Sequence, residues 1–120
     1  MPSDSKFFID LQEFINNQDI FTVYYEEASK KAKFPYGVIS DPNDTDLRYG
    51  ILCYFDIMIW SNDEPIGLKL EEKIEKLINI LDGHIFSNSK AVVYFESKRP
   101  ISDPEYELIK KKITFSVRIF

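Results

Sequence analysis

The segment from Arg48 to Trp60 constrains the fold most, because it predicts a long strand that is apolar on both faces. The odd positions of this segment are apolar throughout: Tyr49, Ile51, Cys53, Phe55, Ile57 and Ile59. The even positions also include four apolar side chains: Leu52, Tyr54, Met58 and Trp60. Successive side chains of a strand point to opposite faces, so both faces of this strand require cover.

Two arrangements provide that cover. Helices can pack on both faces of the sheet, one on each. Alternatively, both helices pack on one face, and the even positions Leu52, Tyr54, Met58 and Trp60 form an apolar patch on the other, joined by Tyr24 and Tyr94. The second arrangement makes Leu52, Tyr54, Met58 and Trp60 a candidate subunit interface, and the sequence leaves both arrangements open.

Two amphipathic helices are predicted. The first begins at Ser3 or Asp4, ends near Asn17, and carries Phe7, Leu11, Phe14 and Ile15 on one face. The second follows the capping sequence from Ser61 to Pro65, and Gly83 is well placed to end it in a left-handed conformation. Its apolar face comprises Ile66, Leu70, Ile74, Leu77, Ile78 and Leu81.

The other strands are predicted at residues 20–25, from Phe34-Pro35-Tyr36 onward, at 91–97 and at 106–120, with a turn around Pro100 to Pro104. Short connections between neighbouring strands favour antiparallel pairing. We therefore expect a single α+β domain over residues 1–120. It should hold a mostly antiparallel sheet of four to five strands packed with two helices, in the order α-β-β-β-α-β-β.

The chain carries no recognisable catalytic motif. Cys53 is the only cysteine and His84 the only histidine, so we expect no disulfide, no metal site, no cofactor and no catalytic residue, with His84 in a surface loop. Neither a secretory signal nor an apolar run long enough for a membrane span is visible, which predicts an intracellular protein.

The net charge of -5 argues against specific nucleic-acid binding, because such proteins usually present a basic face. The basic run from Lys110 to Lys112 is therefore interpreted as solvated surface. Glu71 and Glu75 lie beside lysines of the second helix, where ion pairs within the helix would account for them.

The order of these pieces resembles the tail-terminator and tail-completion (head-tail joining) proteins of long-tailed phages. The likeness covers nearly the whole chain. It rests on Phe34-Pro35-Tyr36, the strand end from Asp56 to Asn62, the helix from Leu70 to Leu77, and the turn from Pro100 to Pro104 before Lys110 to Lys112 and the closing strand.

This resemblance implies a structural protein of a phage or prophage, not an enzyme. Such proteins form a ring, typically hexameric, at the head-proximal end of the tail, and contact the tail tube and the head connector. It also implies the cytoplasm of a bacterial host during assembly, and then the virion tail. Two alternatives stay open: a small cytoplasmic adaptor or regulatory module that forms a dimer, and an enzyme with acidic residues gathered from separate loops.

The acidic segment between the second strand and the long strand contains Asp41, Asp44 and Asp46. Its spacing does not fit a calcium-binding loop, because Asp46 stands where glycine is needed. We expect this loop to contact a partner or to line a channel; the alternative is a solvated loop that orders only on assembly.

Overall fold

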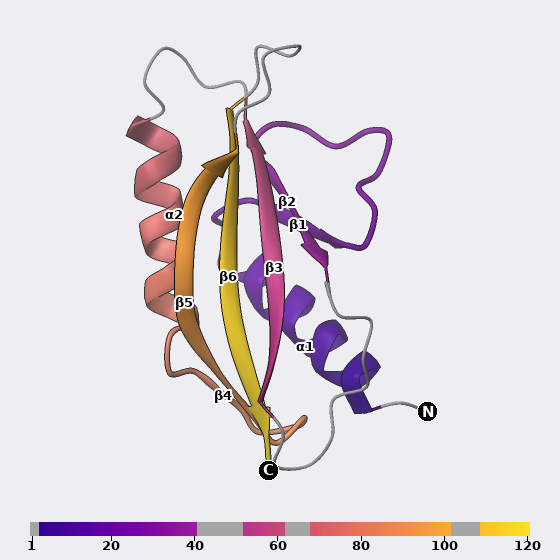
Figure 1. The fold of residues 1–120 in the computed structure, drawn as a ribbon. Helices are drawn as coiled ribbons and strands as arrows, with labels where there is room; N and C mark the ends of the chain where they lie inside the picture. Colours follow the sequence, from indigo (N-terminus) through magenta and orange to yellow (C-terminus); the bar gives the residue numbers. More distant parts are fainter. Residues whose placement is uncertain (1–2, 41–51, 62–67, 102–108) are drawn as a thin grey trace.

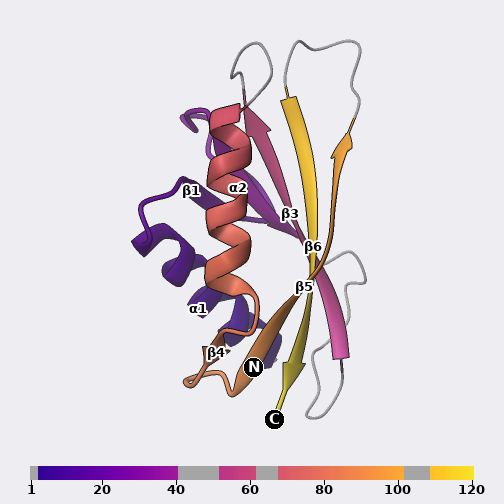
Figure 2. The same cartoon turned by 90° about the vertical axis from the view of Figure 1, so that its left-hand side faces the viewer.

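Both helices of the computed structural model lie on the same side of one curled sheet of six strands (Figures 1 and 2). The structure describes residues 3–40, 52–61, 68–101 and 109–120. The elements are α1 (Ser3–Asn17), β1 (Thr22–Tyr25), β2 (Tyr36–Ser40), β3 (Leu52–Ser61), α2 (Leu68–Leu81), β4 (Ile85–Phe86), β5 (Ala91–Ile101) and β6 (Ile109–Ile119). The α+β class is confirmed, and of the two arrangements that the sequence left open, the structure has both helices on one face (Figures 1 and 2).

The sheet has the strand order β1-β2-β3-β6-β5-β4 and is mixed. The expectation of four to five mostly antiparallel strands is wrong in two details. A sixth strand, β4, consists of only two residues, and β1 pairs with β2 in parallel, with Val23 beside Gly37. Because β1 is only four residues long, the connection over residues 26–35 can return to the starting end of the sheet before β2 begins.

The core lies between the helices and one face of the central strands. Phe55, Ile57 and Ile59 of β3 alternate with side chains of the opposite face, and their partners in β6 are Phe115, Ile113 and Lys111. The largest side chains buried in this core are Phe7, Phe8, Phe55, Phe115, Leu11, Ile15, Ile39, Ile57, Ile59, Leu70, Ile74 and Leu77. One apolar cluster thus joins α1, α2 and the sheet.

The end of α2 follows the predicted pattern. Gly83 has a φ of 79°, the left-handed conformation expected after a helix, and its N–H donates to the carbonyl of Val93 at 2.7 Å. The carbonyl of His84 accepts the N–H of Val93 at 3.1 Å, and the Asp82 carboxylate accepts the N–H of Phe95 at 2.9 Å. The chain leaving α2 is therefore fixed along the outer edge of β5.

One other boundary differs from expectation. β5 extends to Ile101 and includes Pro100, which was predicted to lie in a turn. Proline has no backbone N–H, and it is tolerated there because no further strand among the described residues accepts a hydrogen bond on the outer side of this part of β5. None of the helices in the described parts of the chain is long and apolar enough to cross a lipid bilayer.

Candidate interaction surface

The face of the sheet opposite the helices, here named the open face, carries the even positions of β3. Tyr54 is 42% exposed, while Met58 and Trp60 are half-buried. Leu52 lies opposite Arg118 at the start of the same strand. Tyr94 of β5, 43% exposed, shares this face because it lies opposite Ser116, which also pairs with Tyr54.

An aromatic patch, defined as Tyr24, Phe34, Tyr36 and Trp60, crosses the β1 side of the open face. Tyr36 is stacked between its neighbours, with ring centroids 5.5 Å from Phe34 and 6.4 Å from Trp60. Tyr24 meets Tyr36 edge-on at 6.2 Å. Tyr36 and Trp60 are register partners in β2 and β3, while Tyr24 lies two positions beyond Thr22, the β1 partner of Tyr36, and Phe34 precedes β2.

A shallow hollow of about 290 Å³ lies beside this patch. We name it the acidic hollow, and its lining is Glu26, Glu27, Ala28, Tyr36, Val38, Met58 and Trp60. The turn after β1 places its two carboxylates. Glu26 has a φ of 67° and donates its N–H to the carbonyl of Ile39 at 2.8 Å, while the N–H of Glu27 donates to the carbonyl of Tyr25 at 2.8 Å.

A second apolar cluster lies at the β4 side of the sheet. Its most exposed members are Ile85 (68% exposed), Phe120 (53% exposed) and Tyr94. Together with Ser87, Lys90, Ala91 and Val92 they line a hollow of about 400 Å³. We name this set the Ile85 cluster. The N–H of Phe120 donates to the carbonyl of Lys90 at 2.8 Å, which fixes Phe120 beside the β4–β5 turn.

Buried polar groups support the open face from within the sheet. Asp56 is only 5% exposed and accepts the Thr114 hydroxyl at 2.6 Å, with the Lys112 ammonium at 3.5 Å. Ser116 is 1% exposed and donates its hydroxyl to Glu96 at 2.6 Å. These pairs satisfy polar groups that would otherwise be costly to bury.

The three consecutive lysines are not a solvated run, contrary to the sequence-based interpretation. Lys110 lies over the Trp60 ring with its ammonium 4.1 Å from the centroid, and Lys112 reaches Asp56 on the same face. Lys111 points to the helix side and pairs with Glu71 at 2.8 Å. Neighbouring strand residues face opposite ways, which separates the three charges.

The acidic residues of α2 also have partners in the sheet. Lys98 of β5 contacts Glu71 at 3.2 Å and Glu75 at 2.8 Å, so these ion pairs connect the helix to β5 and β6. The expected pairing within the helix is thus not the arrangement found for Glu71 and Glu75. The hydrogen bond from Lys111 holds the pKa of Glu71 below its ordinary value, and the bond to Glu75 holds the pKa of Lys98 above its own.

Both side edges of the sheet are partly covered by other groups. On β1, the N–H of Val23 donates to the Asn16 side chain at 2.8 Å, and the Val23 carbonyl accepts from Gln12 at 3.2 Å and Asn16 at 3.3 Å. On β5, the residues after α2 cover the first half of the strand, and charged residues and Pro100 follow. Such features oppose pairing with a further strand. Contacts with a partner are therefore expected through side chains of the open face.

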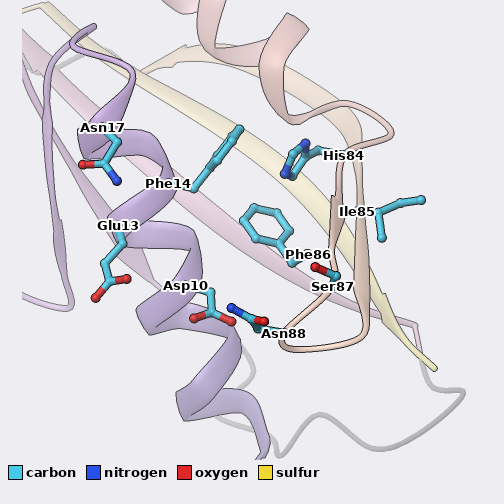
Figure 3. A pocket seen from close by; sticks show the side chains of 9 residues that line it. All are labelled: Asp10, Glu13, Phe14, Asn17, His84, Ile85, Phe86, Ser87 and Asn88. Atoms are coloured by element: carbon cyan, nitrogen blue, oxygen red, sulfur yellow. The ribbon is translucent and has the colours of Figure 1, made fainter.

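A polar hollow of about 240 Å³ lies between α1 and the β4 loop (Figure 3). Asp10, Glu13 and Asn17 face it from α1, but Asp10 accepts a hydrogen bond from Ser89, which ties the two walls together. His84 is half-buried, not a freely solvated loop residue: its ring stacks on Phe14 with centroids 4.2 Å apart. Over the described ranges, no three His, Cys, Asp or Glu side chains lie together as metal ligands.

The predicted residues thus divide into two groups. Tyr54, Met58 and Trp60 lie on the open face, whereas Asp41, Asp44 and Asp46 lie outside the described residues. The sequence reasoning missed Ile85 and Phe120, because single apolar residues beside a turn and after a strand produce no periodic pattern. Neither a protein-family model nor a curated protein sequence matches the chain.

Proposed function

We propose that this chain is a structural subunit of the phage tail-terminator or tail-completion type. It forms a ring, with six copies favoured, at the head-proximal end of a tail and joins the tail to the head. The observation that carries this proposal is the open face, because both helices cover the other side and leave Tyr54, Tyr94, Met58 and Trp60 at the surface or partly exposed. Apolar surface of this kind is typical of a contact with a partner.

The edges of the sheet support an assembly of discrete size. Since Asn16 and Gln12 occupy the outward N–H and carbonyl of Val23 in β1, copies of the chain are proposed to meet through side chains and not by extending the sheet at this edge. Side-chain contacts have a fixed geometry, and a fixed rotation between copies closes a ring. The acidic segment with Asp41, Asp44 and Asp46 is proposed to contact a tail component or line the channel of that ring.

The first test is genetic. The coding sequence is deleted from the phage or prophage that carries it, and particles in the lysate are viewed by negative-stain electron microscopy. We expect tails of unregulated length and heads that stay unjoined, with normal particles restored by a plasmid copy. Particles of normal tail length with joined heads in the deletion strain contradict the proposal.

Mass in solution separates this function from the adaptor. Light scattering is recorded across a concentration series, and the same samples are viewed by microscopy. Rings favour the tail function, while a dimer of unchanged mass over the whole series favours a small adaptor module.

A further inference from the structure

We propose that copies of this chain associate head to tail, with the Ile85 cluster of one copy packed into the acidic hollow of the next. The occupant of the hollow is therefore a second copy of this chain. This inference rests on the proposed ring function and specifies which two surfaces build the ring.

The two surfaces lie at opposite corners of the open face. The acidic hollow uses β2 and the Trp60 end of β3, whereas the Ile85 cluster uses β4, the start of β5 and the residue after β6. In the central pair, Trp60 lies opposite Lys110 and Leu52 lies opposite Arg118. Eight residues of strand separate these two positions, roughly 26 Å at the usual rise. Neither surface can therefore fill the other within one chain.

The chemistry of the two surfaces is complementary. Ile85 and Phe120 are more than half exposed, and they need apolar partners such as Met58, Val38 and the Trp60 ring that line the hollow. Glu26 and Glu27 give the hollow a negative rim. That charge suits the other surface, because Lys90 lies within the Ile85 cluster.

The positions of these charges are set by backbone hydrogen bonds. Glu26 and Lys90 both have positive φ, and the neighbouring strands fix both turns through the Glu26 N–H and the Lys90 carbonyl. Turns with a fixed backbone lose little main-chain freedom on binding, which favours a contact of defined orientation. The charge of Lys110 faces the Trp60 ring in the same chain.

A contact of the hollow with itself is disfavoured by the same charges. A two-fold arrangement would bring Glu26 and Glu27 of one copy toward the same carboxylates of the other, and like charges repel. Two different surfaces on one chain instead generate a heterologous contact, which propagates around a ring until it closes.

Complementary variants test this contact. The cluster variant carries Ile85→Ser and Phe120→Ser, and the hollow variant carries Glu26→Lys and Glu27→Lys; all four side chains are exposed, so the fold should tolerate the changes. Sedimentation velocity should show at least about tenfold weaker association for each variant alone. Ile9→Ser serves as the matched control, because Ile9 is 52% exposed on α1, away from the open face.

The decisive sample is the equimolar mixture of the two variants. Each pair of unlike variants retains one intact cluster and one intact hollow, so the mixture should form a complex of two chains and stop there. Three outcomes overturn the inference: wild-type association in either variant, a mixture that stays monomeric, or a wild-type chain that stays monomeric up to about 1 mM. None of these outcomes alters the tail phenotype of the deletion strain, so the proposed function is judged separately.

Discussion

Glu71 connects three elements through its carboxylate. Lys111 of β6 contacts one oxygen and Lys98 of β5 contacts the other, at 2.8 Å and 3.2 Å. The side chains of Glu71 and Lys98 remain about one-third exposed, at 33% and 32%, so the energetic contribution of these pairs is small, about 0.5 kcal/mol after screening by solvent. The network matters more for the position of α2 on the sheet than for the total free energy of unfolding.

The pH dependence of this network is testable with Glu71→Gln. The pKa of Glu71 is lowered in the folded state, so its contribution is fully present above its ordinary value of 4.5 and is lost as the pH falls through the lower folded-state value. Urea unfolding should therefore show the wild type more stable than the variant at pH 7, with a difference that narrows as the pH falls below 4.5. The exposed neighbour Glu72→Gln is the control. A wild-type advantage that persists unchanged at pH 3 contradicts the assignment.

Gly37 is required at a point of close approach between β2 and the core. A Cβ atom there would lie 3.1 Å from Val23, 3.2 Å from Ile57 and 3.2 Å from Phe21, all closer than normal packing. We expect Gly37→Ala to lower the free energy of unfolding by about 1–3 kcal/mol, measured by urea denaturation. Ser40→Ala, a half-buried position in the same strand, should change it far less. Unchanged stability in Gly37→Ala would show that the three neighbours move aside freely.

Residue-scale details were the least predictable part of the structure. Asp56 lies among apolar residues of β3, and the three lysines of β6 are consecutive; the alternation of side chains along a strand shows which face each occupies but not what it contacts. Their partners are Thr114 for Asp56, the Trp60 ring for Lys110 and Glu71 for Lys111. Each of these pairs joins residues far apart in the chain, so periodicity in one segment carries no information on them.

At the scale of elements, β6 is the strand on which the sheet depends. It pairs with β3 on one side and β5 on the other, and Val117 and Ile119 enter the core. We expect deletion of Val117 to Phe120 to abolish cooperative unfolding, because it removes buried apolar area and one end of both ladders at once. Arg118→Ser, which changes an exposed side chain in the same segment, should unfold as the wild type does. Native circular dichroism with a cooperative thermal transition in the truncated chain contradicts this prediction.

The long elements were predictable because each repeats a clear pattern. α2, β3 and β6 lie where three-and-four or alternating spacing of apolar residues placed them. The two-residue strand β4 is too short for any period. The parallel direction of β1 and β2 was missed because a ten-residue connection is compatible with either direction when the first strand is short.

At the scale of the whole molecule, the sequence left two arrangements of the helices and the structure decides between them. Each amphipathic helix has one apolar stripe, and the pattern of that stripe does not indicate which face of a sheet the helix will cover. Tyr54, Met58 and Trp60 lie on the face of the sheet without helices. Sequence alone could not tell whether a helix covers these apolar residues or leaves them at the surface. The apolar residues of β3 on the open face were therefore predictable as a candidate surface, whereas the Ile85 cluster was not.

The amide side chains that cover the edge of β1 also bear on how the chain folds. Asn16 is only seven residues from Val23, so this contact closes a short loop, whereas the paired residues of β3 and β6 are 48 to 66 positions apart. The edge is thus shielded early, while the central strands are still unpaired. A nascent chain of this design should therefore resist cross-pairing with neighbouring chains through the edge of β1.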